Sequence, residues 1–278
     1  MITGEERLIA LGTGNASARR CYNTCFVLLG GGADPLLVDG GGGNRIFDQL
    51  DAAGVSLTDI HHAVLTHAHT DHLLGMLWVL RAVATLMKQK AYDGLFTLYC
   101  HASLAKFVMD FVKMSFDAGM QATFDKTLHI TPVADGETRM VGGRAVTFFD
   151  IHSNKLCQYG FLLRLATGGR LIFSGDEPLP QELHELAYGA DWMLSEAFCL
   201  ASESARFHPY EKHHSTVKDA CLMAEALGIA NLVLWHTEDT HVPHRKRDYL
   251  AEGSPLFSGT LYIPDDLETI ILAQRSRS

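Results

Sequence analysis

The feature that most constrains this chain is a run of three histidines and one aspartate within six residues. The segment reads Thr-His-Ala-His-Thr-Asp-His over residues 66–72. His67 and His69 are two residues apart, so in an extended loop their side chains point to the same side. Imidazole nitrogens and carboxylate oxygens are the ligands that zinc takes in proteins. The run therefore predicts a metal site on a loop that leads from a strand at 63–65 into a helix at 73–90.

The composition limits the classes of protein to which this chain can belong. Hydrophobic residues make up 47% of the 278 residues and charged residues 20%, which is typical of a globular chain and excludes a disordered or fibrous one. The net charge of −9 provides no basic surface for wrapping nucleic acid, although metal ions would add charge that this count omits. The N-terminal segment carries two glutamates and does not resemble a secretory signal. The six scattered cysteines contain no Cys-x-x-Cys pair and predict reduced thiols in a cytoplasmic protein.

Strand and helix patterns alternate along the chain without a Pro/Ser-rich linker or a repeat. The predicted strands are 7–11, 21–29, 35–38, 63–65, 95–99, 145–149, 160–165, 171–173, 192–194, 232–235 and 269–272. The predicted helices are 44–53, 73–90, 104–116, 180–188, 217–227 and 244–252. This alternation indicates one layered α/β domain over residues 1–278.

Polar residues follow several of the predicted strands at the point where each strand ends. Asp39 follows Leu-Leu-Val, Asp176 follows Leu-Ile-Phe-Ser-Gly, and His236 follows Leu-Val-Leu-Trp. Glu196 ends the strand Trp-Met-Leu-Ser in the same way. Unpaired polar groups are costly inside a strand, whereas the strand ends at one edge of an α/β sheet form its ligand sites. We therefore expect a shared polar cleft.

These motifs, in this order, resemble those of the metallo-β-lactamase superfamily. The resemblance rests on Asp39 in LLVDG, the THAHTDH run, His152 in FFDIH, Asp176 in FSGDE and His236 in LWHT. It covers nearly the whole chain and implies an αββα sandwich with a dinuclear metal cleft at one edge. The implied ligands are His67, His69 and His152 for one ion, Asp71, His72 and His236 for the other, and Asp176 as the bridge.

The resemblance also implies the cofactor and its surroundings. Two zinc ions are expected, with manganese or iron as alternatives, because histidine and carboxylate ligands admit all three. Asp39 would accept a hydrogen bond from a ligand histidine and fix its orientation.

Two further segments resemble ribonuclease Z, the tRNA 3′-processing endonuclease. His-Ser-Thr at 214–216 resembles its HST motif, and Ser-Glu-Ala at 195–197 resembles the motif that partners that histidine. The resemblance implies a phosphodiesterase in which hydroxide held by the metals attacks phosphorus and Asp71 helps to orient it. His214, held by Glu196, would protonate the leaving group, a contribution typically worth roughly 10²–10⁴-fold.

The chain also departs from that family. Only 24 positions separate His152 from Asp176, where bacterial ribonuclease Z carries a long arm that grips tRNA. Glu177 and Pro178 stand where the family tends to have threonine and a basic residue. The predicted substrate is therefore a small phosphodiester or an RNA 3′ end. The apolar helix at 73–90 could hold a homodimer face, although core packing is its commoner use.

Other classes on the same fold stay open. A lactonase, thioesterase or β-lactamase-like hydrolase is the first alternative, although lactonases have no HST motif to match His214. Flavin-linked diiron redox proteins replace the second histidine of the run with glutamate, whereas this chain keeps His69. A binding module without catalysis would usually have lost metal ligands, and all seven are present.

Overall fold

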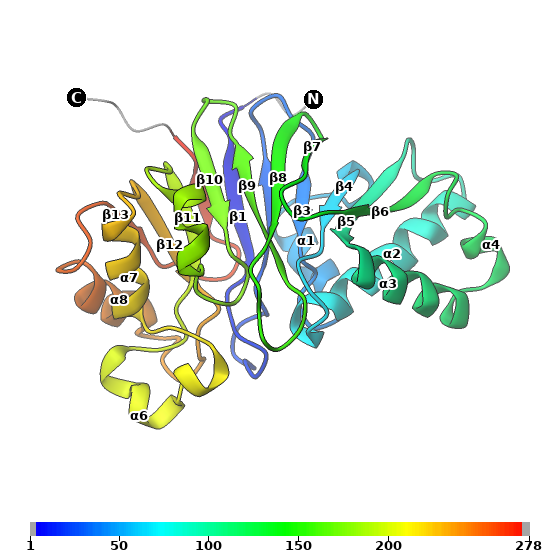
Figure 1. The fold of residues 1–278 in the computed structure, drawn as a ribbon. Helices are drawn as coiled ribbons and strands as arrows, with labels where there is room; N and C mark the ends of the chain where they lie inside the picture. The colour runs from blue at the N-terminus through cyan, green and yellow to red at the C-terminus, as the bar shows by residue number, and fades with distance from the viewer. Residues whose placement is uncertain (1–3, 274–278) are drawn as a thin grey trace.

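The computed structural model describes residues 4–273. Two seven-stranded sheets pack face to face, and helices cover the outer face of each sheet (Figure 1). The result is the αββα sandwich that the motifs predicted.

The first sheet has the strand order β14-β1-β2-β3-β4-β5-β6. Its strands, in chain order, are β1 (Arg7–Gly12), β2 (Cys25–Leu29), β3 (Leu36–Val38), β4 (His62–Val64), β5 (Phe96–His101), β6 (Leu128–Val133) and β14 (Thr269–Ile271). Strands β3 to β6 are parallel to one another, so their carboxyl ends lie at the same edge of the sheet.

The second sheet has the order β13-β12-β11-β10-β9-β8-β7. Its strands are β7 (Thr138–Val141), β8 (Arg144–Asp150), β9 (Tyr159–Arg164), β10 (Arg170–Phe173), β11 (Trp192–Glu196), β12 (Asn231–Trp235) and β13 (Thr260–Tyr262). Strands β10 to β13 are again parallel. Antiparallel β8, β9 and β10 form a meander in which His152 follows β8, and β9 and β10 lie between His152 and Asp176.

The helices divide between the two outer faces (Figure 1). Those beside the first sheet are α1 (Ile46–Ala52), α2 (Thr70–Lys88), α3 (Ala102–Ser115) and α4 (Ala118–Gln121). Those beside the second are α5 (His184–Ala187), α6 (Ser204–Phe207), α7 (Val217–Ala226) and α8 (Arg245–Gly253). Short 3₁₀ turns, η1 to η4, cover Leu57–Asp59, Gln181–Leu183, Ala201–Glu203 and Tyr210–Lys212. No helix within residues 4–273 combines the length and the apolar character needed to cross a membrane.

The apolar core follows these layers. Phe26 of the first sheet packs between the sheets against Phe173 and Trp235 of the second, with ring centroids 5.3 and 5.0 Å away. A second group of buried side chains fills the space between the first sheet and α1–α3, and a third lies between the second sheet and α7–α8. Five of the six cysteines are buried thiols, as expected, whereas Cys157 is exposed.

One glycine contact fixes the start of α2 against the first sheet. Gly75 lies within α2, and a Cβ atom there would sit 1.7 Å from the carbonyl oxygen of Gly40. The Gly40 N–H donates to the His72 carbonyl, and the Gly75 N–H donates to the Gly41 carbonyl. Only glycine permits this approach. The Gly40–Gly43 run is therefore a tight turn that holds the segment 66–72 against the first sheet.

Candidate metal centre

The metal-ligand run lies on the loop from β4 to α2. His69 is the residue before α2, and Asp71 and His72 lie in its first turn. Asp176 follows β10 of the other sheet, and His236 follows β12. These residues come from the carboxyl ends of parallel strands, the edge at which α/β folds place their sites.

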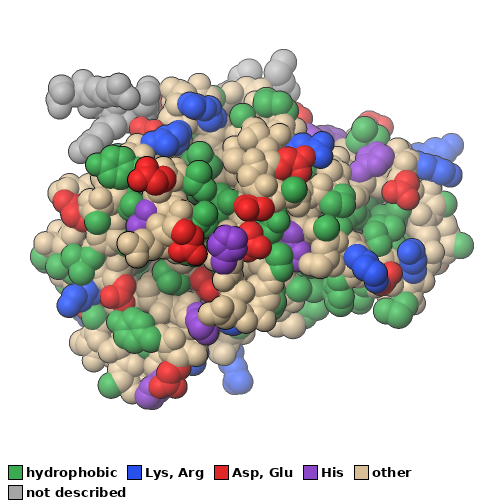
Figure 2. Space-filling model, viewed as in Figure 1, with side chains coloured by type: hydrophobic (Ala, Val, Ile, Leu, Met, Phe, Trp, Pro, Cys, Tyr) green, Lys and Arg blue, Asp and Glu red, His purple; other side chains and the backbone are tan. Residues whose placement is uncertain are grey.

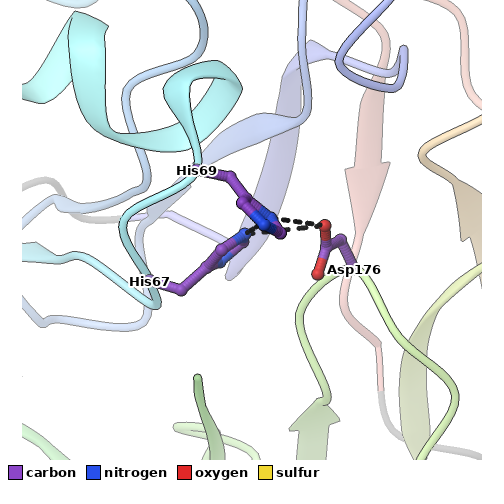
Figure 3. Close-up of side chains that lie close together, drawn as sticks. All are labelled: His67, His69 and Asp176. Atoms are coloured by element: carbon purple, nitrogen blue, oxygen red, sulfur yellow. Dashed lines mark hydrogen bonds and ion pairs between the residues drawn. The ribbon is translucent and has the colours of Figure 1, made fainter. Parts of the chain in front are cut away.

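Asp176 stands at the centre of the histidines. Its Oδ2 atom lies 3.5 Å from His67 Nε2, 3.6 Å from His69 Nδ1 and 3.6 Å from His236 Nε2. Figure 3 shows the two rings of the run directed at this carboxylate. His72 Nε2 is 3.9 Å from the same oxygen and 3.4 Å from Asp71 Oδ2. One carboxylate oxygen therefore lies near four imidazoles.

Two neighbouring groups of ligand-type atoms result. In each group, one nitrogen or oxygen from every member lies within 4.8 Å of the others. The groups are His67 with His69 and Asp176, and Asp71 with His72 and His236. The structure thus brings together six of the seven ligands that the sequence implied.

The outer nitrogens of three rings are held by hydrogen-bonding groups behind the cluster. His67 Nδ1 lies 2.9 Å from the Thr66 hydroxyl, and His236 Nδ1 lies 3.1 Å from the Thr24 hydroxyl. His72 Nδ1 lies 2.8 Å from Asp39 Oδ2, which is the orienting role that the resemblance implied for Asp39. Such partners fix the ring orientation and direct each Nε2 toward the cluster. There, His67 Nε2 lies 2.9 Å from His69 Nδ1. No sequence motif marked Thr24, whereas Thr66 directly precedes the run.

The backbone at two of these positions is uncommon. Asp39 has φ of +57° and His236 has φ of +55°, both in the left-handed region. Non-glycine residues rarely adopt it, and those that do cluster at functional sites. Both residues follow a strand directly, so the left-handed turn redirects the chain where the side chain enters the cluster.

The charge balance of the cluster calls for a cation. Asp39, Asp71 and Asp176 are buried, and within residues 4–273 their ion pairs are to histidines alone. Asp71 Oδ2, His72 Nε2 and Asp176 Oδ1 are buried and have no hydrogen-bond partner there. Buried charges are normally paired or coordinate metals. The oxygen and nitrogen donors present fit a divalent transition ion.

Local electrostatics set the protonation of the ligands. Burial lowers the pKa of His67, and it lowers that of His236 to about 3, so both rings are neutral as metal binding requires. Burial would raise the pKa of Asp176, but the neighbouring His67, His69 and His236 hold it well below its ordinary value. Burial would lower the pKa of His72, yet the carboxylates beside it raise it well above its usual range.

His152 is the one implied ligand that the structure does not gather. Its side chain is 54% exposed, and its Nδ1 lies 4.0 Å from Asp150 Oδ1. Local polar contacts explain the outward position. The His152 N–H donates to Asp150 Oδ1 at 2.8 Å, and the next residue, Ser153, donates its hydroxyl to Glu177. The loop is therefore anchored beside Asp176 while the His152 ring faces solvent.

The predicted acid pair lies beside the cluster. His214 Nδ1 is 3.6 Å from Glu196 Oε2, and Glu196 Oε1 accepts the Ser215 N–H at 2.6 Å. Glu196 is fully buried at the end of β11, and burial raises the pKa of its carboxyl against the opposing effects of His214 and Ser215. The His214 ring stacks on Phe198 at 5.0 Å and lies 5.4 Å from the ring of His236.

A cavity of about 350 Å³ opens over the metal ligands and His214. Two lysines that no motif marked, Lys155 and Lys212, also line it. Lys155 Nζ lies 3.1 Å from Glu177 Oε1, and Lys212 Nζ lies 4.9 Å from the Phe198 ring centre. Acidic and histidine side chains gather near the middle of the face drawn in Figure 2. The cavity thus combines side chains of the histidine–aspartate cluster, the His214 ring and two cationic side chains.

Several known proteins are similar to the chain over almost its full length. Ribonuclease Z from Nocardia farcinica is 26% identical over 322 aligned positions, which cover 98% of this chain and 99% of that protein. The metallo-β-lactamase fold protein YhfI from Bacillus subtilis has a TM-score of 0.75 at 16% identity, covering 96% of this chain and 99% of its own. Human tRNase Z, short form, has a TM-score of 0.71 at 18% identity, and the match covers 96% of this chain and 99% of the human protein.

The fold and the histidine–aspartate cluster define this protein as a metal-dependent hydrolase of the metallo-β-lactamase superfamily, similar to ribonuclease Z. Within that class, the chain belongs to the family described as Anti-Pycsar protein Apyc1, whose model matches residues 6–251.

Proposed function

We propose that the protein is a phosphodiesterase with a dinuclear zinc centre and a small phosphodiester as substrate. The observation that carries the proposal is the single cavity that joins the Asp176-centred cluster to His214, behind which Glu196 is buried. The six gathered residues would hold the ions: His67, His69, Asp71, His72, Asp176 and His236. His152 remains a predicted seventh ligand.

The chemistry divides between the ions and the protein. When bound, the ions would supply a nucleophile from water at neutral pH and offset the charge of the phosphate oxygens. The Asp71 and Asp176 carboxylates line the same cavity and would orient the attacking oxygen. His214 would give its proton to the departing oxygen, because a poor alkoxide leaving group benefits from general acid catalysis. Glu196 would hold the His214 ring in position.

The substrate class follows from the size and charge of the cavity. About 350 Å³ lies at the lower end of the range for small-molecule pockets. Lys155 and Lys212 place positive charge at this cavity in a chain of net charge −9, which favours an anionic substrate.

An RNA 3′ end is the second candidate, because the curated relatives are named ribonuclease Z. The alignment to the Nocardia protein spans 322 positions against 278 residues, so at least 44 positions of that relative have no counterpart here. In this chain, β9 and β10 pair directly between His152 and Asp176 and carry no arm. The Mycobacterium ribonuclease Z aligns over 279 positions that cover 95% of its length, so it has no comparable extra length. The small cavity with its two lysines, rather than the missing arm, therefore favours the small phosphodiester.

An activity panel on purified protein of measured metal content tests the proposal. The panel contains a nitrophenyl phosphodiester, cyclic nucleotides, a tRNA precursor, a lactone and a thioester. We expect turnover of the nitrophenyl diester and of a cyclic nucleotide, with the tRNA precursor cleaved more slowly. Turnover of the lactone or thioester alone would instead establish an ester hydrolase, and preference for the tRNA precursor would establish the RNA 3′ end.

Removal of either cavity lysine should weaken substrate binding. Lys155→Ala and Lys212→Ala should each raise KM for an anionic phosphodiester by roughly tenfold, the equivalent of about 1.4 kcal/mol, with a smaller change in kcat. Raising the salt concentration should shrink the difference because exposed charges are screened. The exposed Lys126, changed to alanine, is the control. Unchanged KM in both variants would remove the lysines from substrate recognition.

A further inference from the structure

A second group of metal-type ligands lies outside the catalytic cluster, where η3 meets the loop that follows β12. One ligand atom each from Glu203, Glu238 and His241 lies within 4.8 Å of the other two. His241 Nε2 is 3.0 Å from Glu203 Oε1. The group brings together two carboxylates and one imidazole from segments about 35 positions apart in the chain, which is the donor set of many divalent-ion sites.

A buried carboxylate oxygen without a hydrogen-bond partner is a second, independent observation that points to a ligand at this cluster. Glu238 is only 4% exposed. Its Oε2 accepts the N–H and the hydroxyl of Thr240, whereas its Oε1 is buried and has no hydrogen-bond partner within residues 4–273. Glu203 Oε2 is buried and unpartnered in the same way. Buried carboxylate oxygens are normally satisfied, so two of them in one cluster need an explanation.

Protein cations do not explain the cluster. In the described part of the chain, Glu238 forms no ion pair with lysine or arginine, and the cationic neighbour of Glu203 is Arg206, 3.2 Å from Oε1. Arg206 is 58% exposed and leaves Oε2 of Glu203 unpaired. A cation between the two glutamates would satisfy both buried oxygens at once.

The surroundings of His241 match those of a metal ligand. Its Nε2 faces the glutamate Glu203, and its Nδ1 lies 3.8 Å from Asp248 Oδ2 on α8. Histidine ligands usually have a carboxylate or carbonyl behind the ring that sets its orientation. Asp248 stands in that position.

We propose that Glu203, Glu238 and His241 form a further cation site, distinct from the catalytic cluster, for a divalent ion such as zinc. Its effect would be structural. The Glu238 N–H donates to the Phe198 carbonyl at 2.8 Å, and the Phe198 ring stacks on His214. An ion that ties Glu238 to Glu203 would therefore stabilise the segment around Phe198, against which the predicted acid His214 packs.

Metal counting on purified full-length protein tests the site, with zinc supplied and excess removed by dialysis. Because the catalytic ions contribute to the total, the informative measure is the difference between variants. His241→Ala should bind one zinc ion fewer per chain than the unmodified protein. Glu203→Gln should do the same, because it removes the charge and keeps the shape of the side chain.

The chain offers a matched control pair. His208 Nδ1 lies 3.2 Å from Glu211 Oε1, but both side chains are exposed and belong to no ligand group within residues 4–273. His208→Ala and Glu211→Gln should leave the zinc count unchanged. Equal zinc counts in all four variants and the unmodified protein would overturn the proposal and leave His241 as a protonated bridge between Glu203 and Asp248.

A thermal measurement keeps the test decisive if one variant folds poorly. In the Asp176→Asn background, which weakens the catalytic cluster, added zinc should still raise the Tm through the second site. The same addition should give a smaller rise when His241→Ala is combined with Asp176→Asn, because only residual binding at the catalytic cluster remains. A zinc-dependent rise of equal size in both backgrounds would place the stabilising ion elsewhere.

Discussion

Asp176→Asn should abolish most activity and lower the zinc content of the protein. The substitution keeps the shape of the side chain and removes its charge, and the oxygen affected lies within 3.9 Å of four imidazole nitrogens. Loss of groups that merely orient metal ligands typically costs 10–100-fold in affinity or activity. Loss of the central carboxylate should therefore exceed ~100-fold in kcat/KM, with at least one zinc ion per chain lost.

Two companion variants sharpen this result. Asp51→Asn, on the exposed side of α1, changes the same chemical group away from the cavity and should behave as the unmodified protein. His152→Ala tests whether His152 binds metal, as the motif implies, or remains exposed to solvent, as the structure places it. Loss of zinc would support the ligand role, and full retention of zinc would support the exposed position. Asp176→Asn protein that retains its full zinc content and its rate would refute a bridging carboxylate.

The site could be predicted from the sequence wherever a local motif places the ligand. The run places His67 and His69 on the loop before α2, and Asp71 and His72 in the first turn of that helix. Because all four lie within six residues, local geometry alone brings them close together. Asp176 and His236 were identified by their places at strand ends, and the parallel strands of the second sheet deliver them to the cluster.

Residues that reach the site only through tertiary packing are not marked by any motif in the sequence. Thr24 contacts His236 across 212 positions, and Lys212 reaches the cavity from a 3₁₀ turn. The second ligand group around Glu238 combines η3 with a loop, so no spacing rule could reveal it. His241 accordingly belongs to no motif in the sequence.

The strands of the fold could likewise be predicted only where their own sequence pattern was strong. The sequence did not predict the three strands β6, β7 and β13, and each of them lies at an edge of its sheet. β6 contains Pro132, which is tolerated at a sheet edge and argues against a strand in a sequence. β7 exposes three of its four residues, and β13 has no fully buried residue. Such strands form because a neighbour presents a free edge, and their own apolar pattern is weak.

His214→Ala should slow the cleavage of substrates with poor leaving groups by roughly 10²–10⁴-fold, the usual contribution of a general acid. A nitrophenyl leaving group departs without a proton, so its cleavage should fall by less than about tenfold. The separation depends on His214 lying beside the cluster, 5.4 Å from the His236 ring, without belonging to either ligand group. Measured kcat values for an alkyl and a nitrophenyl phosphodiester give the comparison directly.

Zinc content and a partner variant distinguish proton donation from damage to the metal centre. His214→Ala should retain the full zinc content. Glu196→Gln should show the same dependence on the leaving group, because it removes the carboxylate that pairs with His214 while its amide oxygen can still accept the Ser215 N–H. Equal losses on both substrates would mean that His214 positions the substrate or the ions, because a proton donor matters only when the leaving group requires a proton.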